Sequence, residues 1–330
     1  MCKVKILLIV LFIANHFNHA TTENYEKQFQ DEKENIKEFI AVETNSFLAK
    51  LNEKRVEDTK DQITMKQIKD DKQLTQENEI LIDILNNFST TLKDQNKNKG
   101  EKIRYIEIKD KKYCYKITTE AKNGIMFASD THADADTVKK IWYFFDKLKK
   151  GNKVDKLVFL GDYGDRGKFW TYTYFLLAAM AEKYGEDIIF IRGNHEDMRI
   201  MNDNSSYETI CAIGNHEKCA KNCWDEMPLI CEITWNQKKI FCSHGAMPLN
   251  EQGEWVQETT NDGLYFLANW NENIFTENQQ QGIQKSSRGA GYAISIKEIF
   301  QNMVNNEYDW SIHGHVHKNQ CGISKKQING

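Results

Sequence analysis

Short apolar runs that end abruptly in His, Asp or Asn constrain the fold of this chain more than any other feature. Five such runs occupy residues 125–128, 157–160, 188–191, 240–242 and 310–312. Their length predicts buried strands, and helical periodicity lies between the first three of them. This order predicts an α/β fold in which helices cover a sheet, with the functional loops beyond the carboxyl ends of the strands.

The polar clusters after these runs hold an unusual concentration of potential metal ligands. Beyond residue 20, every histidine except His216 lies in one of them. A single Asp after a strand is usually a helix cap and a single Gly-Asp is usually a turn, but neither explains five clusters in order. Oxygen and imidazole donors without thiolates suit manganese, zinc or iron(II). An Asp shared by two such ions, about 3.5–4 Å apart, builds a site that binds phosphate and activates water.

Two clusters carry a specific resemblance. Residues 161–167 (Gly-Asp-Tyr-Gly-Asp-Arg-Gly) and 192–196 (Arg-Gly-Asn-His-Glu) resemble the central signatures of the phosphoprotein phosphatases, within the calcineurin-like metallophosphoesterase superfamily. Residues 240–245 and 287–289 resemble further elements of that family, and the likeness covers roughly residues 125–318. It implies a four-layer α/β/β/α sandwich. It also implies hydrolysis of phosphate monoesters, above all phosphoserine and phosphothreonine in proteins, by direct attack of a bridging metal-bound hydroxide.

The resemblance also assigns roles to individual residues. It implies two divalent ions, with manganese expected and iron or zinc as alternatives. His195 would be the proton-transferring residue, oriented by Asp165. The phosphate would be bound by Arg166, Arg288 and Asn194. The metal ligands would be Asp130, His132, Asp162, Asn194, His244 and His315, with Asp162 shared. His317 is either a further ligand or a residue that contacts one.

Departures from the family pattern keep alternatives open. Ser129, Ala133 and Ala246 stand where the motifs usually have glycine, and no match to the family's C-terminal segment follows. A nucleotide or dinucleotide polyphosphate hydrolase of the same superfamily is one alternative, because one metal site serves many phosphate esters. A catalytically silent binding protein is another, although no ligand has been lost. Asp165 counts against a purple acid phosphatase, which needs a tyrosine there.

The N-terminus predicts entry into the secretory pathway. Lys3 and Lys5 precede a short apolar run, and Ala20 offers a cleavage site, so residues 1–20 read as a signal peptide. A buried N-terminal helix and an uncleaved anchor are the alternatives, and the second would be the route to a membrane. In an oxidising compartment, the crowding of Cys211, Cys219 and Cys223 predicts a local disulfide.

The remaining sequence divides into two parts. Residues 21–100 are highly charged, with apolar residues at helical spacing, and predict an amphipathic helical extension. This extension either packs on the main domain or forms an arm with a partner. Residues 101–330 form the predicted metallophosphoesterase domain, which begins with a predicted β-hairpin. The net charge of −4 with mixed signs argues against a nucleic-acid partner. Asn87 and Asn204 stand in possible glycan-acceptor tripeptides.

Overall fold

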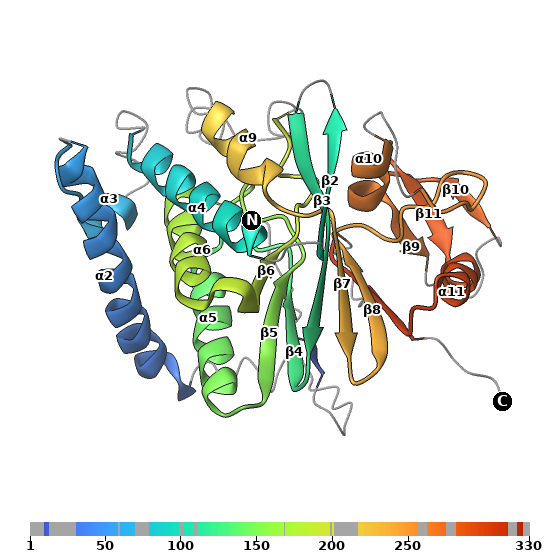
Figure 1. The fold of residues 1–330 in the computed structure, drawn as a ribbon, viewed down its shortest axis with the longest axis horizontal. Helices are drawn as coiled ribbons and strands as arrows, with labels where there is room; N and C mark the ends of the chain where they lie inside the picture. Colours follow the sequence, from blue (N-terminus) through green and yellow to red (C-terminus); the bar gives the residue numbers. More distant parts are fainter. Residues whose placement is uncertain are drawn as a thin grey trace.

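The computed structural model describes residues 10–12, 31–58, 60–69, 79–98, 102–108, 111–167, 169–198, 200, 217–256, 263–274, 282–315 and 322–325. Two β-sheets lie at its centre, with helices on the outer side of each (Figure 1). This is the α/β class that the apolar runs predict.

The first sheet carries three of the predicted strand ends. Its four strands have the order β1-β4-β5-β6, in which β4, β5 and β6 are parallel and β1 pairs antiparallel with β4. Helix α5 connects β4 to β5, and α6 connects β5 to β6, as the periodicity predicts. The bounds are β1 (Val10–Phe12), β4 (Gly124–Ala128), α5 (Ala135–Lys150), β5 (Val154–Phe159), α6 (Trp170–Tyr184) and β6 (Ile188–Phe190). Since the three strands run the same way, their carboxyl ends meet at one edge.

The second sheet carries the other two strand ends. Its six strands have the order β13-β12-β8-β7-β3-β2. β8 and β12 are parallel, with Ser243 paired to His313, so the segments that follow them start side by side. β2 and β3 form the predicted hairpin. The bounds are β2 (Ile103–Ile108), β3 (Lys111–Ala121), β7 (Ile230–Trp235), β8 (Lys238–Ser243), β12 (Trp310–His313) and β13 (Gly322–Lys325).

A smaller unit covers the outer face of the second sheet. It contains α10 and α11 with a three-stranded sheet of order β10-β11-β9 (Figure 1). None of these strands was predicted from the sequence. The bounds are α10 (Gly263–Trp270), β9 (Glu272–Ile274), β10 (Ile283–Lys285), β11 (Tyr292–Ser295) and α11 (Ile296–Asn305).

Three separate hydrophobic clusters show that the molecule has four layers. Ile125 and Phe127 of β4 lie in the cluster between the two sheets, while Met126 and Ala128 lie in the cluster beneath the helices. A third cluster joins the second sheet to α10 and α11. Strands buried on both faces are apolar at successive positions, which explains the continuous runs in the sequence. The arrangement is the expected α/β/β/α sandwich.

The N-terminal helices belong to the outer helical layer. Phe88 of α4 is fully buried and contacts Phe190 of β6 edge-on, at 5.0 Å between ring centroids. Phe47 of α2 contacts Phe175 of α6 in the same way, at 5.1 Å. The apolar faces of these helices are therefore buried within the chain itself, as a packed extension requires. The helices are α2 (Lys33–Glu57), α3 (Met65–Lys69) and α4 (Glu79–Lys97).

Two expectations about secretory chemistry need correction. Cys219 and Cys223 lie one turn apart on α9 (Glu217–Asp225), and both are free thiols. Cys223 is buried in the core, so it is not accessible to a partner thiol. Cys211 lies outside the described residues. The local disulfide is therefore absent from the part of the chain described. The tripeptide at Asn87 lies within α4, and its Ser89 is buried, so a glycan there is incompatible with the packed helix. Asn204 also lies outside the described residues.

The structure describes only residues 10–12 of the first 30, and it describes them as a strand. β1 adds an edge to the first sheet and is not the helix considered as an alternative to a signal peptide. Among the residues described, no helix is long and apolar enough to cross a membrane.

Candidate metal centre

Main-chain hydrogen bonds hold the loops after the strands together. The amide of Asp130 donates to the carbonyl of Gly161 at 3.0 Å, and the amide of His132 donates to the carbonyl of Asp162 at 2.9 Å. On the other sheet, the amide of Gly314 donates to the carbonyl of His244 at 2.9 Å. Main-chain hydrogen bonds alone thus hold these polar loops next to one another, independently of their side chains.

Many residues of these loops adopt a left-handed backbone. Such a conformation costs non-glycine residues free energy and concentrates at functional sites. It aims the side chains into one region, because the chain turns sharply at each strand end. The residues with positive φ in the loops are Asp130, His132, Ala133, Asp162, Asp165, Arg166 and His315.

Two glycines allow the closest approach in the site. Gly161 has φ of +99°, and a Cβ there would lie 2.5 Å from the Cα of Gly193. A Cβ on Gly193 would lie 2.3 Å from Oδ1 of Asp162. The Cβ on Gly193 would also lie 2.4 Å from the backbone nitrogen of Asp162, so both substitutions clash with backbone that cannot move aside. The motif glycines are therefore required by the packing of two loops around Asp162.

Asp162 lies at the centre of two groups of potential metal ligands. The first group is His132, Asp162 and His195, and the second is Asp162, His244 and His315. In each, the ligand atoms lie within 4.8 Å of one another, and all these residues are buried. Asp162 is common to both, as predicted for the shared ligand.

Asn194 and Asp130 complete the surroundings of these groups. Oδ1 of Asn194 lies 2.8 Å from Nε2 of His244 and 3.0 Å from Nδ1 of His315. Oδ1 of Asp130 lies 3.9 Å from Nε2 of His132. All six predicted ligands that the structure describes are therefore brought together. The structure adds His195 to the first group, and His317 lies outside the described residues.

The donor set fits divalent ions. Oδ1 of Asp130 and Oδ2 of Asp162 are buried oxygens that accept no hydrogen bond from the described residues. Burial alone raises the pKa of Asp162, but the imidazoles of His244 and His195 outweigh it and hold this pKa well below its usual value. Buried carboxylate oxygens without donors are costly unless a cation binds them. Metal ions would therefore satisfy groups that the protein leaves unsatisfied.

The predicted proton-transferring pair is also assembled. Nδ1 of His195 lies 2.6 Å from Oδ2 of Asp165, and both residues are buried. Burial lowers the pKa of His195, but the carboxylates of Asp162 and Asp165 outweigh it, so the net shift is upward. The bond to Asp165 fixes the ring orientation and turns Nε2 toward the metal groups.

The two predicted phosphate-binding arginines reach the centre from opposite sides. Nη2 of Arg166 lies 2.9 Å from Nε2 of His195, and Nη1 of Arg288 lies 3.2 Å from Nε2 of His315. Nε of Arg288 also lies 3.5 Å from a carboxylate oxygen of Glu272. Two guanidinium groups at the solvent side of the imidazoles can bind the oxygens of a phosphate ester.

Glu196 is an organising residue that the sequence reasoning did not assign. Its buried carboxylate accepts main-chain N–H groups of Asp162 (2.8 Å), Tyr163 (3.0 Å) and Gly193 (2.9 Å). Burial, together with the charge of Asp162, raises its pKa to about 7. Glu196 thus ties the loop after β5 to the loop after β6. Its place directly after His195 was the available signal.

Ser129 orients a predicted ligand. Its hydroxyl donates to Oδ2 of Asp130, which also accepts the amide of His315 at 3.1 Å. These two bonds leave Oδ1 of Asp130 directed at the first group. Gly314 is needed here, since a Cβ on it would lie 1.9 Å from the Ser129 hydroxyl oxygen.

Ser129→Ala should therefore weaken metal binding. Residues that orient a metal ligand typically contribute about 10–100-fold to affinity, and we expect about 10-fold here. The measurement is manganese titration of the metal-stripped protein by calorimetry. Ser89→Ala serves as the control, because that buried hydroxyl donates to the carbonyl of Asn222 and belongs to neither group of ligands. An unchanged affinity in Ser129→Ala would show that Asp130 needs no such support.

The chain is similar in sequence to known phosphatases. The family model described as calcineurin-like phosphoesterase matches residues 124–319. The serine/threonine-protein phosphatase 6 catalytic subunit of Caenorhabditis elegans is 29% identical over 179 residues, which are 50% of this chain and 52% of that protein. The chain thus spans about half the length of this curated relative.

Two solved structures resemble the chain more remotely. One is a protein serine/threonine phosphatase from Saccharomyces cerevisiae with similarity to human phosphatase PP5, at 16% identity and a TM-score of 0.49, covering 72% of this chain and 71% of that one. The other is a cold-active protein-tyrosine phosphatase of a psychrophilic Shewanella species, at 16% identity and a TM-score of 0.41, covering 60% and 67%. At these values neither structure bears on the substrate.

Proposed function

The chain belongs to the calcineurin-like phosphoesterase family, and from this membership we propose that it is a metal-dependent phosphatase acting on phosphoserine or phosphothreonine in proteins. The observation that carries the proposal is the pair of ligand groups that share Asp162, flanked by two arginines. The similarity to a serine/threonine-protein phosphatase supports the choice of substrate.

The site's own residues account for the steps around the phosphate. When bound, two divalent ions would lower the pKa of a water and neutralise phosphate oxygens. Arg166 and Arg288 bind the remaining oxygens and disperse charge in the transition state. His195, held by Asp165, gives its Nε2 proton to the leaving serine or threonine oxygen. Asn194, whose Oδ1 lies beside the imidazoles of His244 and His315, would contact both an ion of the second group and the phosphate.

A substrate panel tests this proposal. Purified protein with added manganese should hydrolyse p-nitrophenyl phosphate and serine phosphopeptides, and chelator should abolish both activities. Dinucleotide polyphosphates should be poor substrates, because Arg166 and Arg288 are proposed to bind the terminal phosphate of a monoester. Faster hydrolysis of dinucleotide polyphosphates would favour the superfamily's nucleotide hydrolases instead. Loading the stripped protein in turn with manganese, iron and zinc tests the proposed preference for manganese.

We also propose that the protein enters the secretory pathway. The basic and apolar order of residues 1–20 supports this. Removing residues 1–20 would take away β1 and leave β4 as the edge of the first sheet. Amino-terminal sequencing of the expressed protein should find a start after Ala20, with any glycan at Asn204 and none at Asn87. An intact N-terminus in a cytosolic fraction would contradict the proposal.

A further inference from the structure

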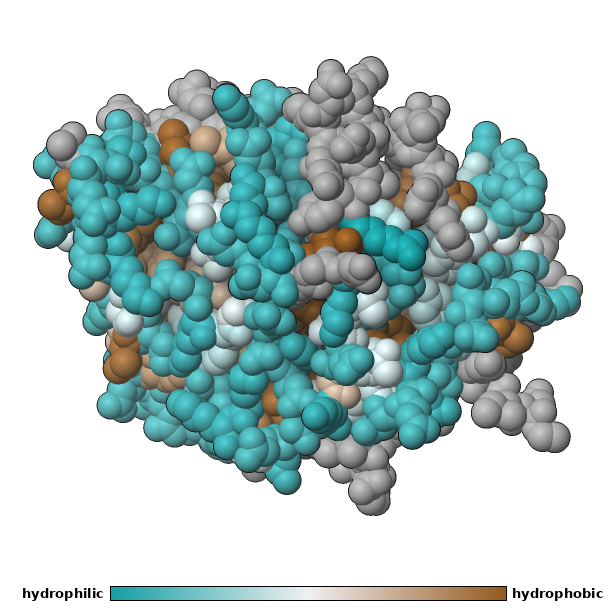
Figure 2. Space-filling view, viewed as in Figure 1, coloured by the Kyte–Doolittle hydropathy of each residue, from teal (hydrophilic) through white to brown (hydrophobic). Residues whose placement is uncertain are grey.

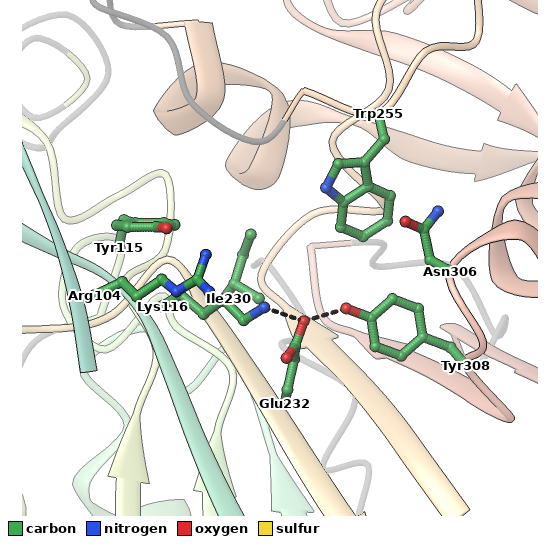
Figure 3. Close-up of a pocket in the computed structure, with 8 residues that line it drawn as sticks. All are labelled: Arg104, Tyr115, Lys116, Ile230, Glu232, Trp255, Asn306 and Tyr308. Atoms are coloured by element: carbon green, nitrogen blue, oxygen red, sulfur yellow. Dashed lines mark hydrogen bonds and ion pairs between the residues drawn. The ribbon is translucent and has the colours of Figure 1, made fainter. Parts of the chain in front are cut away.

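Polar clusters away from the metal ligands occur in both halves of the sandwich. One lines a cavity of about 250 Å³ on the outer face of the second sheet, where Glu232 binds Lys116 and Tyr308 (Figure 3). Another is built around Arg192, which follows β6 in the helical half of the molecule. This second cluster contacts the loop that carries the predicted proton-transferring histidine, so it bears directly on the metal centre.

Arg192 connects the two ends of the loop after β6. Its guanidinium Nε donates to the main-chain carbonyl of Glu196 at 3.0 Å. Its own amide donates to the carbonyl of Pro228 at 2.9 Å, which fixes the backbone at the start of the loop. Asn194 and His195, a predicted ligand and the predicted proton donor, stand between these two contacts. The side chain of Arg192 therefore limits how far this part of the loop can open.

The guanidinium of Arg192 is in turn held by Asp225, the last residue of α9. Nη1 of Arg192 donates to Oδ1 of Asp225 at 2.9 Å, and the two side chains are only 10% and 15% exposed. The other oxygen of Asp225 lies 2.6 Å from Nζ of Lys221, one turn earlier on α9. A planar guanidinium bonds its acceptors in fixed directions. Asp225 therefore orients one side of the group while the other side bonds Glu196.

Helix α4 of the N-terminal extension holds α9 next to Asp225. The side-chain amide of Asn96 donates to the carbonyl of Glu226 at 3.0 Å, and Nζ of Lys93 lies 3.7 Å from the Glu226 carboxylate. The buried face of α9 lies in the same hydrophobic cluster as the apolar face of α4 (Figure 1). The surface above the N-terminal helices is mostly hydrophilic (Figure 2), so the contacts of the extension are directed inward.

We infer that Asp225 is a positioning residue for the loop after β6, acting through Arg192 on Glu196. The carboxylate of Glu196 accepts the amide of Asp162 at 2.8 Å, so a displaced loop would also disturb the shared ligand. The N-terminal extension then supports the metal centre by holding α9 at Glu226. This inference rests on the proposed metal-dependent phosphatase function.

The first test is Asp225→Asn, which keeps the shape of the side chain and removes its charge. With saturating manganese, the full chain should hydrolyse p-nitrophenyl phosphate with kcat about 10-fold lower and KM nearly unchanged, because Arg166 and Arg288 still bind the phosphate. The metal-stripped variant should bind manganese about 10-fold more weakly by calorimetry. Asp146→Asn is the matched control, a buried carboxylate on α5 that binds Lys183. It should lower Tm and leave kcat and manganese affinity unchanged.

A double variant separates this path from a general loss of stability. Arg192→Lys keeps the positive charge but lacks the planar fork, so it should lower kcat about as far as Asp225→Asn does. The protein with both substitutions should be no slower than either single variant, because each breaks the same contact. Arg192→Lys also tests the path by itself if Asp225→Asn does not fold.

The contribution of the extension is tested by Asn96→Ala, which removes the bond to the carbonyl of Glu226. This substitution should lower kcat by about 3-fold, the effect of one ordinary hydrogen bond. Asn52→Ala is its control, because Asn52 donates to the carbonyl of Ile63 within the extension itself. The control should leave kcat unchanged.

Two outcomes overturn the inference. One is a folded Asp225→Asn protein with the kcat and manganese affinity of the original chain, and the other is additive losses in the double variant. Neither measurement depends on whether the natural substrate is a phosphoprotein. If the original chain hydrolyses no phosphate ester, the proposed function fails, and the manganese affinity of Asp225→Asn still decides whether Asp225 positions the loop.

Discussion

Asp162→Asn should abolish the proposed phosphatase activity, lowering kcat/KM by roughly 10³-fold or more, which corresponds to about 4 kcal/mol of transition-state stabilisation. The reason is geometric. Asp162 belongs to both ligand groups, and its buried Oδ2 accepts no hydrogen bond from the described residues. An amide in place of the carboxylate removes the negative charge that would hold both ions, so metal content should fall with activity.

The measurement pairs steady-state kinetics with metal analysis after dialysis. Asp155→Asn is the matched control, because Asp155 also accepts main-chain N–H groups, from Lys122 and Asn123, but at the opposite ends of the strands. Circular dichroism should show both variants folded. Activity undiminished in Asp162→Asn, or full metal content with no activity, would each contradict the role of a shared ligand.

His195→Ala should lower kcat by about 10²–10⁴-fold while both metals stay bound. Proton transfer to the leaving oxygen needs the Nε2 of an oriented imidazole, and His195 is oriented by the 2.6 Å contact with Asp165. Asp165→Asn should have a smaller effect, because it disturbs the orientation of the ring and leaves the ring in place. Kinetics with p-nitrophenyl phosphate, whose leaving group needs no proton, should show a smaller loss than kinetics with a phosphoserine peptide.

Metal analysis of His195→Ala decides between two roles. The structure groups His195 with His132 and Asp162 within 4.8 Å, so the geometry also permits it to be a ligand. Loss of one metal equivalent in this variant would identify His195 as a ligand of the first ion. Retention of both ions with slow turnover would identify it as the proton donor.

Most of the helical layer and the first sheet could be predicted from the sequence, because local patterns specify them. The runs at β4, β5 and β6 are apolar at successive positions, since both of their faces are buried. The periodicity of α5 reflects one face against that sheet, whereas α6 is buried on all sides from Trp170 to Ala181. The order of the polar clusters predicted the position of the site, because parallel strands bring consecutive strand ends to one edge of the sheet.

The features that could not be predicted depend on contacts distant in sequence. Glu196 is a carboxylate like any other until the fold brings the amide of Asp162 to within 2.8 Å of it. The hydroxyl of Ser129 gains a role only beside Asp130 and Gly314. The thiol of Cys223 looked available for a disulfide, but its helix turns it into the core, where burial raises its pKa.

The burial of α2 and α4 has a consequence for the order of folding during synthesis. These helices leave the ribosome before α5, α6 and α9, yet their apolar faces rest on those three helices. Phe88 cannot meet Phe190 until about a hundred further residues have emerged. Until then the nascent chain exposes two amphipathic helices, which is the kind of surface that chaperones bind. The N-terminal segment should therefore dock late, and the stability of the whole helical layer should depend on translation reaching α9.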